Sequence, residues 1–514
     1  MSLLGLDVGT TGCKAVLFST TGDVLASGYT EYNITRKQAG YAELDSREVW
    51  QSIKQTIKQT TGASGPEGTG GKASKKDPIT AVSIASMGEA VVPVSRDREI
   101  LGPSIMNFDI RGEEYLSRLN ASFSDKDLYD INGNTLANQF GITKLMWIKN
   151  HQPELYEKSY KFLLWSGFVA FMLGAEPFVD YSLANRTLLF DLQTCDWSQP
   201  LLDAAGLDRE KLPDTVQSGK NIGTVSAAVA RELGLPEGTA ILAGAHDQCA
   251  NAVGCGVITP GSAMYGMGTF VCIAPVFTGR KETEKMLEAG LNTEHHAVKD
   301  LFVSFIYNMG GSIIKWFRDT YAGSEHEAAA AEGKDIYPAL FAEVPEGKTR
   351  VTVLPHFTPM GPPDFIDDSL GAIAGLNLET SRGEILKSII ESNVFSLKEC
   401  IELLPETGME ISNYRVVGGG SKSDIMVQTC CDILETPFVR PKVTEAGALG
   451  AAILAGLGTG VFNSFQEGVD AMVVLGDRFE PADTYRNYYR EKFEQYKKLY
   501  PALEDFIGGL RGIT

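Results

Sequence analysis

Two aspartates stand at the ends of short apolar segments. Asp7 lies near the end of the apolar run 3–8, and Asp247 follows the run 240–245 directly after His246. At the carboxyl end of a strand in an α/β domain, a carboxylate tends to face the ligand crevice. One of the two can hold Mg²⁺ through water, and the other can accept a proton from a hydroxyl group. The alternative is that each acid only caps a helix or a turn.

Three turns combine glycine with side-chain hydroxyls. Glycine lets backbone N–H groups approach an anion, and Ser or Thr adds a hydroxyl donor. Where a helix follows, its N-terminus adds a favourable field. Each turn alone is also typical of an ordinary loop, but the three together predict a nucleotide held from two domains. The turns are Gly9-Thr10-Thr11, Gly268-Thr269 and Gly418-Gly419-Gly420-Ser421.

A Gly-Gly-Lys sequence lies in the stretch 61–77, which is rich in Gly, Ser and Lys. A phosphate loop with this spacing needs glycine at position 66 and Ser or Thr at position 73. The chain has Pro66 and Ala73 there. The stretch is therefore predicted to be a solvated loop.

The elements that position these residues form two similar units. Apolar strands at 3–8, 14–19 and 24–29 predict an opening meander, and the helix 46–60 follows with Ser46 as its cap. A second hairpin is predicted over 263–277, so that Gly268-Thr269 matches Gly9-Thr10. Further on, a strand at 415–417 leads through glycines into a helix at 423–434. A helix at 445–455 is rich in Ala and Gly and suited to close packing.

Composition limits the classes of partner. The 514 residues include 46 Lys and Arg against 65 Asp and Glu, a formal net charge of −19. Such a surface repels nucleic acids and anionic membranes, so neither is an expected partner. The eight cysteines form no C-x-x-C pair and indicate core thiols in a reducing compartment.

No segment predicts export or membrane insertion. The first residues lack the pattern of a signal peptide. The longest apolar run, 162–175, is too short to span a bilayer and predicts a buried helix. We therefore expect a cytoplasmic protein.

Several segments resemble the FGGY carbohydrate kinases, a family of the sugar-kinase, heat-shock-protein and actin superfamily. Residues 371–376, 384–385 and 388–391 fit the family's second signature, whereas the first fits only in part, since Gln139 and Gly141 do not match its opening. The resemblance implies an α/β fold of two ribonuclease-H-like (actin-like ATPase) domains facing each other across a cleft. Residues 1–250 would bind the sugar and carry the base, and residues 251–514 would bind the nucleotide. The other matching segments are residues 4–11 with Lys14, residues 144–150 and residues 180–197.

The resemblance also implies roles for individual residues, with ATP and Mg²⁺ as cofactors. Asp247 matches the family's catalytic aspartate, which accepts the proton of the attacking hydroxyl. Asp7 resembles the residue that holds Mg²⁺ through water. The expected nucleotide-binding residues are Thr10, Thr11, Lys14, Gly268, Thr269, Gly311, Gly419, Gly420 and Ser423.

The substrate is a small sugar or polyol by this resemblance. Xylulokinases usually have Met-His-Gly and glycerol kinases Arg-Glu where this chain has Met87-Gly88-Glu89. A ketopentose such as xylulose is the first expectation, and glycerol, tetritols, deoxy-hexoses and ketohexoses remain open. The expected substrate-binding residues are Met87, Glu89, Asp109, Arg111, His246 and Gln248.

Alternatives remain for these residues and for the function. Glu89 can be an exposed turn carboxylate, Asp109 and Arg111 a structural ion pair, and His246 a satisfied core histidine. The competing functions are a non-metabolic actin-like ATPase and a catalytically silent sugar-binding regulator. A homodimer is the expected assembly, because it is common in the family.

Overall fold

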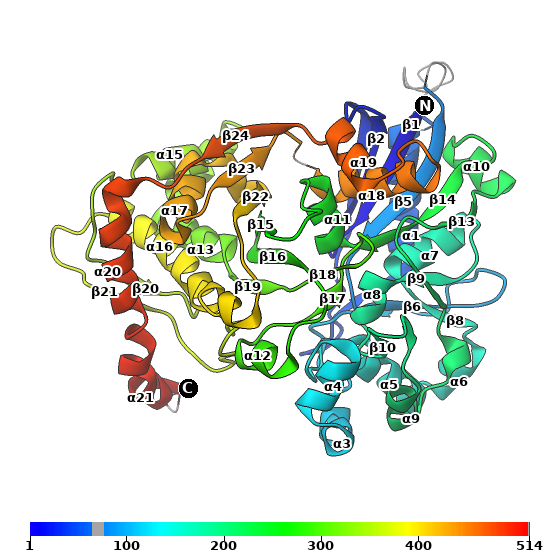
Figure 1. The fold of residues 1–514 in the computed structure, drawn as a ribbon, viewed down its shortest axis with the longest axis horizontal. Helices are drawn as coiled ribbons and strands as arrows, with labels where there is room; N and C mark the ends of the chain where they lie inside the picture. Colours follow the sequence, from blue (N-terminus) through cyan, green and yellow to red (C-terminus); the bar gives the residue numbers. More distant parts are fainter. Residues whose placement is uncertain (64–76, 444, 512, 514) are drawn as a thin grey trace.

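The computed structural model describes residues 1–63, 77–443, 445–511 and 513. Residues 64–76 of the predicted solvated loop therefore lie outside the described residues. The chain forms two α/β units, each built around its own sheet (Figure 1). The first sheet forms from the N-terminal half of the chain and the second from the C-terminal half.

The first sheet begins with the predicted meander. β1 pairs with β2 and β2 with β3 in antiparallel fashion, while β1, β5 and β14 run parallel to one another. The carboxyl ends of β1, β5 and β14 therefore meet at one edge. In spatial order the strands are β13 (Asn221–Thr224), β14 (Ala240–His246), β5 (Ile79–Ser86), β1 (Ser2–Val8), β2 (Gly12–Ser19) and β3 (Val24–Glu31).

The second sheet repeats the opening hairpin of the first. β15 pairs antiparallel with β16 and parallel with β22, which confirms the predicted hairpin and its Gly268-Thr269 turn. β19 (Ile306–Met309) also pairs with β16 but stands outside the main strand order of the sheet. That order is β17 (Glu294–His295), β18 (Leu301–Val303), β16 (Phe270–Thr278), β15 (Ser262–Met267), β22 (Asn413–Val417), β23 (Phe438–Pro441) and β24 (Leu475–Phe479).

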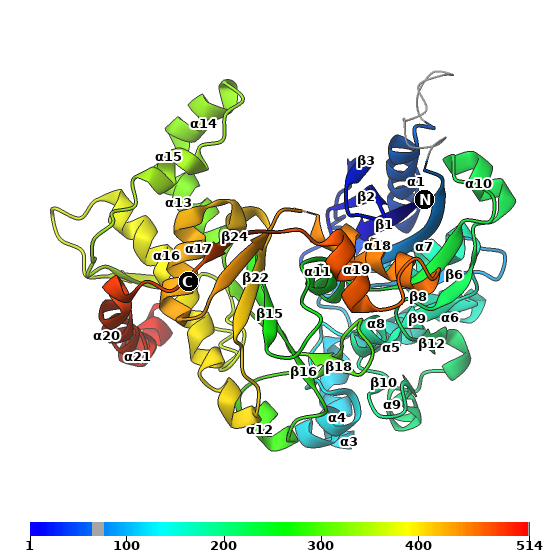
Figure 2. The ribbon, with the colours of Figure 1, turned by 45° about the horizontal axis from the view of Figure 1, so that its top comes forward.

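A helix from late in the chain completes the first unit. α18 (Ala446–Gly458) lies against β1 and against α11 (Asp247–Gly254) in both views (Figures 1 and 2). A Cβ on Gly450 would lie 1.9 Å from the carbonyl oxygen of Ala250, and one on Gly5 would lie 1.9 Å from that of Ala448. Glycines thus allow the helix backbones and the sheet to touch, as the composition of residues 445–455 predicted.

The remaining helices surround the two sheets, and α14 and α15 project from the second unit (Figure 2). In the N-terminal half they are α1 (Ser46–Thr61), α3 (Leu116–Ser122), α4 (Asp125–Asn132), α5 (Gly141–His151), α6 (Pro153–Lys158), α7 (Trp165–Leu173), α8 (Tyr181–Asn185), α9 (Gln199–Ala205) and α10 (Ala227–Leu233). In the C-terminal half they are α12 (Thr283–Glu288), α13 (Gly311–Tyr321), α14 (Gly323–Ala331), α15 (Tyr337–Ala342), α16 (Arg382–Ile401), α17 (Asp424–Leu434), α19 (Phe465–Met472), α20 (Arg486–Tyr496) and α21 (Leu499–Arg511).

Short strand pairs complete the connections. They are β4 (Glu43–Leu44) with β7 (Ser104–Ile105), β6 (Val91–Val94) with β8 (Lys161–Leu164), β9 (Phe178–Asp180) with β12 (Asp214–Val216), β10 (Phe190–Asp191) with β11 (Asp196–Trp197), and β20 (Thr352–Leu354) with β21 (Ala372–Ala374).

Two local predictions were wrong. The cap of α1 is Asp45, whose carboxylate accepts the N–H groups of Arg47 and Glu48, and not Ser46. Aspartate is as good a cap as serine, so the position was off by one residue. The apolar run 162–175 is divided, because its first residues pair as β8 before α7 begins.

The thiols lie mostly in the core, as expected, since six of the eight cysteines are buried and two are partly buried. All eight cysteines are free, and Cys430 and Cys431 are buried in α17. Within the described ranges, no helix is both long and apolar enough to cross a bilayer.

Candidate active site

The parallel strand ends of the first sheet bring several predicted residues to one edge. Asp7 on β1 is opposite Ala85, and Ser86 at the end of β5 is opposite His246. Met87 and Glu89 follow β5, and Asp247 follows β14. The backbone N–H of Met87 donates to the carbonyl of Val8 at 2.9 Å, which holds the two strand ends together. Both acids thus stand at strand ends, as the sequence indicated.

Asp247 is the first residue of α11. Burial raises the pKa of its carboxyl to about 7, and the charges of Asp7 and Glu89 add to the shift. Gln248 Nε2 donates to Asp247 Oδ1 at 3.2 Å, and His246 Nε2 lies 3.3 Å from the same oxygen. Neither of these two contacts involves Oδ2. A carboxyl with this pKa suits a general base near neutral pH.

Asp7 lies against the N-terminal end of α18. Burial raises its pKa to about 6, which the charge of Lys14 opposes and that of Glu445 reinforces. A Cβ on Gly447 would lie 2.4 Å from Asp7 Oδ2, so glycine at this position makes room for the carboxylate. Lys14 Nζ donates to Glu445 Oε2 at 2.5 Å. The structure therefore places Lys14, which we expected to hold phosphate, in an ion pair.

The donor set at this edge fits Mg²⁺. Asp7 and Asp247 supply hard carboxylate oxygens, and in kinases Mg²⁺ commonly takes one or two carboxylates, with substrate phosphates and water completing its shell. Within residues 1–63, 77–443, 445–511 and 513, no group of three or more His, Cys, Asp or Glu side chains is arranged so that it could hold a metal ion by itself. Asp7, which the resemblance assigned to Mg²⁺, is the residue that would hold the ion, and Asp247 remains available as the proton acceptor.

The turn between β1 and β2 carries Thr10 and Thr11 at its tip, where Thr11 is exposed. Tyr32 holds this turn, because its hydroxyl donates to the carbonyls of Gly9 at 2.6 Å and Gly12 at 3.0 Å. The two hydroxyls are therefore presented from a fixed hairpin.

The second unit contains a cavity of about 880 Å³. Near it, the N–H of Gly311 at the start of α13 donates to the carbonyl of Gly268 at 2.9 Å. A Cβ on Gly311 would lie 2.6 Å from that oxygen, which explains the glycine. All the nucleotide-binding residues that we expected in this unit line the cavity: Gly268, Thr269, Gly311, Gly419, Gly420 and Ser423. Thr10, Thr11 and Lys14 lie apart, on the first unit.

The cavity also contains residues that sequence reasoning missed. Lys315 stands one turn after Gly311 on α13, so helical spacing from Gly311 was a signal for it. Asn393 on α16 lines the cavity and has a buried Oδ1 without a hydrogen-bond partner in the described structure. Buried polar atoms usually have partners, so the unpaired oxygen fits a site that takes a polar ligand.

Glu89 is not an exposed turn carboxylate. It is buried at 5% exposure and pairs with Arg186, whose Nε lies 2.7 Å from Glu89 Oε1. Burial raises its pKa, Arg186 opposes this rise, and Glu294 adds to it. Its backbone has φ 60°, a left-handed conformation that is costly for glutamate. Such a conformation is often retained where a side chain has a functional task.

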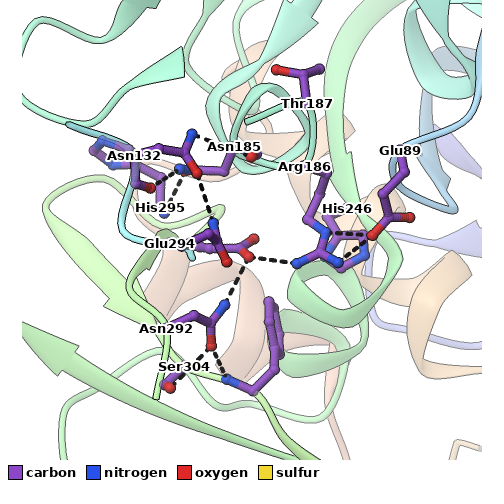
Figure 3. Close-up of polar contacts among 12 residues, drawn as sticks. Glu89, Asn132, Asn185, Arg186, Thr187, His246, Asn292, Glu294, His295 and Ser304 are labelled. Atoms are coloured by element: carbon purple, nitrogen blue, oxygen red, sulfur yellow. Dashed lines mark hydrogen bonds and ion pairs between the residues drawn. The ribbon is translucent and has the colours of Figure 1, made fainter. Parts of the chain in front are cut away.

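Arg186 and Glu294 were not among the expected site residues. Arg186 Nη1 donates to Glu294 Oε1 at 2.6 Å, and Figure 3 shows the guanidinium between Glu89 and Glu294 with His246 beside it. Arg186 lies in a segment that resembles the family, but Glu294 comes from β17 of the second sheet. No pattern in the sequence indicated that these residues meet.

His246 is buried but not fully hydrogen-bonded. Its Nδ1 has no partner in the described part of the chain, and its ring packs edge-on against Phe305. Burial, together with the charge of Arg186, lowers its pKa well below the usual value, so the imidazole is neutral. Ser182 Oγ accepts its backbone N–H at 2.9 Å and fixes the strand end beside Asp247.

Asp109 and Arg111 form a buried ion pair away from these contacts. Arg111 Nη2 donates to Asp109 Oδ2 at 2.6 Å, and Arg111 Nη1 to Glu43 Oε1 at 2.6 Å. Asp109 Oδ2 also accepts the N–H of Ala42. Burial acts to raise the pKa of Asp109, but its hydrogen bonds with Arg111 and Ala42 hold that pKa below its usual value. These contacts favour the structural alternative over substrate binding.

Most of the chain matches one known protein family. Residues 2–254 match the N-terminal domain, and residues 261–459 the C-terminal domain, of the FGGY family of carbohydrate kinases. The chain is 28% identical over 514 residues to a xylulose kinase from Bacillus subtilis, covering 99% of this chain and 98% of that protein. It is 26% identical to a gluconokinase from the same species, covering 98% and 96% of the two chains.

The fold is also found in solved structures. The structure of xylulose kinase from Rhodospirillum rubrum superposes with a TM-score of 0.86 at 24% identity, covering 99% of this chain and 100% of that one. At this identity the likeness shows a shared fold of two actin-like ATPase domains.

Proposed function

The chain belongs to the FGGY family of carbohydrate kinases, and on that premise we propose that it transfers the terminal phosphoryl group of ATP to a hydroxyl of a ketopentose such as xylulose. It is a phosphotransferase with an alcohol group as acceptor. The choice of acceptor rests on the xylulose kinases among its relatives.

A single observation carries the proposed chemistry. Asp247 has a pKa of about 7 and lies at the same sheet edge as Asp7, beside the buried pair of Glu89 and Arg186. This arrangement supplies a proton acceptor, a carboxylate for a metal ion and acceptors for sugar hydroxyls. The three functions are what phosphoryl transfer to an alcohol requires.

In the proposed reaction, Asp247 Oδ2 accepts the proton of the sugar hydroxyl as its oxygen attacks the γ-phosphorus of ATP. The neutral His246 and Gln248 orient Asp247 through Oδ1. Glu89 accepts hydrogen bonds from other hydroxyls of the acceptor. Because the transition state needs little covalent help, the main work of these residues is alignment.

The phosphate chain would lie between the two hairpins. Thr10 and Thr11 donate hydroxyls from the first unit, and Gly268 and Thr269 approach from the second. Mg²⁺ held by Asp7 neutralises the phosphate charge when bound. In this proposal an approaching phosphate competes with Glu445 for Lys14.

Adenine and ribose would occupy the cavity of the second unit. Its volume of about 880 Å³ is within the range of nucleotide-sized ligand sites. Gly419, Gly420 and Ser423 lie where β22 leads into α17. The division into a sugar-binding part, residues 1–250, and a nucleotide-binding part, residues 251–514, falls inside α11 and belongs to the same proposal.

A panel of acceptors tests the function. Purified protein with Mg²⁺-ATP is assayed for ADP release with xylulose, ribulose, glycerol, erythritol, fucose and fructose. We expect acceptor-dependent ADP release that is fastest with a ketopentose. Equal ADP release with and without every acceptor would contradict a kinase of this type and favour an ATPase. Light scattering on the same preparation tests the proposed homodimer.

A further inference from the structure

A cluster of three charged side chains lies beside the proposed base. Arg186 follows α8 and places its guanidinium between two carboxylates (Figure 3). Its Nε and Nη2 both donate to Glu89 Oε1, and its Nη1 donates to Glu294 Oε1. The exposed fractions of the side chains are 12% for Arg186, 7% for Glu89 and 1% for Glu294. All three charges are therefore held largely out of water.

This cluster carries a net negative charge. Two carboxylates face one guanidinium, and Asp247 adds a further negative charge nearby when it is ionised. The neighbouring His246 contributes no compensating charge, because burial and Arg186 lower its pKa far below neutrality. Buried charges interact more strongly than charges in water, so this excess of negative charge acts on any charged ligand that binds beside the cluster.

The cluster is positioned to meet the acceptor. A Cβ on Gly88 would lie 3.0 Å from Arg186 Cγ, so the glycine lets the arginine pass beside the Met87–Glu89 turn. His246, whose Nε2 lies 3.3 Å from Asp247 Oδ1, connects the cluster to the base, since the charge of Arg186 acts on His246 and the charge of Glu89 acts on Asp247 itself. The charges of this cluster therefore act electrostatically on an acceptor whose hydroxyl is aligned on Asp247.

Glu294 is fixed from the far side of the guanidinium. Asn292 Nδ2 donates to Glu294 Oε1 at 2.7 Å, and Asn292 Oδ1 accepts the N–H of Phe305 at 2.7 Å. The next residue, His295, donates its N–H to Asn185 Oδ1 at 3.0 Å. Asn185 directly precedes Arg186, so the segment that carries Glu294 is tied to the segment that carries the arginine.

Resting on the proposed kinase function, we propose that this cluster selects uncharged sugars and polyols and rejects sugar acids, with Glu294 as the positioning residue that sets the selection. A guanidinium binds a carboxylate best through two parallel N–H bonds. Here its Nε and Nη2 face Glu89 and its Nη1 faces Glu294. A sugar carboxylate would find the N–H groups of Arg186 already bonded to carboxylates, and Glu89, Glu294 and Asp247 would repel it. Sugar hydroxyls carry no charge and can donate hydrogen bonds to Glu89.

Matched acceptor pairs test the selection in the native enzyme. Each pair has the same carbon number but ends in a hydroxymethyl group or a carboxylate: glycerol and glycerate, xylitol and xylonate, glucitol and gluconate. Dissociation constants are measured by calorimetry without nucleotide, and kcat/KM by ADP release. We expect the uncharged member to be favoured about tenfold or more in each pair that binds. Preference for the acid in these pairs overturns the inference.

Two substitutions test the role of Glu294. Glu294→Gln removes the charge at nearly constant shape, whereas Glu294→Asp keeps the charge. We expect Glu294→Gln to raise the ratio of acid to uncharged acceptor about tenfold in both binding and kcat/KM, and Glu294→Asp to leave it within about threefold of the native value. Equal changes for both members of a pair would indicate a merely structural role and overturn the assignment.

The two proposals fail in different ways. If no acceptor stimulates ADP release but the uncharged members still bind more tightly, the kinase proposal fails and the charge selection stands. If acceptors are phosphorylated but acids are preferred, the charge selection fails and the kinase proposal stands. The comparison of pairs in the native enzyme does not depend on the folding of any variant.

Discussion

At the scale of single residues, the carboxyl groups of the first sheet edge determine the proposed chemistry. Asp7 and Asp247 each have a raised pKa because they are buried close to other negative groups. Perturbed acids of this kind gather at functional sites. The charge of Glu89 acts on Asp247, His246 lies beside it, and Arg186 pairs with Glu89.

Replacing Asp247 by asparagine tests the base directly. Asparagine keeps the size of the side chain but cannot take the proton, so we expect kcat to fall by about 10²–10⁴-fold. Nucleotide affinity, measured by calorimetry, should stay within about twofold, because the nucleotide cavity lies on the other unit. A variant that keeps most of its kcat would show that Asp247 is not the base.

The pH dependence follows from the raised pKa of Asp247. The base works when ionised, so kcat/KM for the acceptor should rise with pH and level off above about 7. Glu89 helps to raise this pKa. Glu89→Gln should therefore move the acid limb of the profile to lower pH, whatever it does to the absolute rate.

Glu232→Gln provides the matched control for that profile. Glu232 pairs with Lys54 on the surface and is remote from the site, so its loss should leave the acid limb unchanged. If the acid limb does not move in Glu89→Gln, the charge of Glu89 does not influence the pKa of the base.

At the scale of elements, close packing of α11 and α18 positions both acids. Asp247 begins α11, and Gly447 of α18 leaves room for Asp7. The two helices meet through backbone atoms at Gly254 and Gly450, where an added Cβ would lie 1.9 Å from a carbonyl oxygen. This contact joins a helix of the late chain to the sheet of the early chain.

Gly450→Ala should therefore be destabilising. The new methyl group must displace the backbone of α11 or α18, and overpacking of a core typically costs about 1–3 kcal/mol. We expect a lower melting temperature by scanning calorimetry than for the native protein.

The control is Gly508→Ala on α21, where an added Cβ meets no atom within 4 Å. Alanine is the better helix former by about 1 kcal/mol, so this variant should melt at the same or a higher temperature. If both variants melt like the native protein, the close helix contact does not limit stability.

At the scale of the whole molecule, the proposed base and the nucleotide cavity belong to different units. Asp247 follows a strand of the first sheet, whereas Gly268, Gly311 and Gly419 line the cavity beside the second. Phosphoryl transfer needs the two to meet across the cleft. We propose that closure of one unit on the other brings them together and excludes water from the reaction.

Small-angle scattering tests this closure. We expect the radius of gyration to fall when an acceptor and a non-hydrolysable ATP analogue are added together, and to fall less with either alone. An unchanged radius with both ligands bound, as checked by calorimetry on the same sample, would contradict closure.

The sequence was sufficient for features that depend on neighbouring residues. Alternating apolar runs and glycine turns predicted both hairpins, and Asp7 and Asp247 were correctly placed at strand ends. Local patterns carry this information because strands and turns are selected by residues a few positions apart. Helix caps were harder, since Asp45 and Ser46 are both good capping residues and only geometry chooses between them.

Only the tertiary structure decided which distant residues meet. Glu89, Arg186 and Glu294 are separated by about a hundred positions from one to the next, and no local pattern links them. Likewise, the sequence left open whether Asp109 and Arg111 bind substrate or form a structural ion pair, and it did not indicate that Arg111 pairs with both Asp109 and Glu43. Burial and pairing of charges are properties of the packed molecule, because each depends on what other segments place around the group.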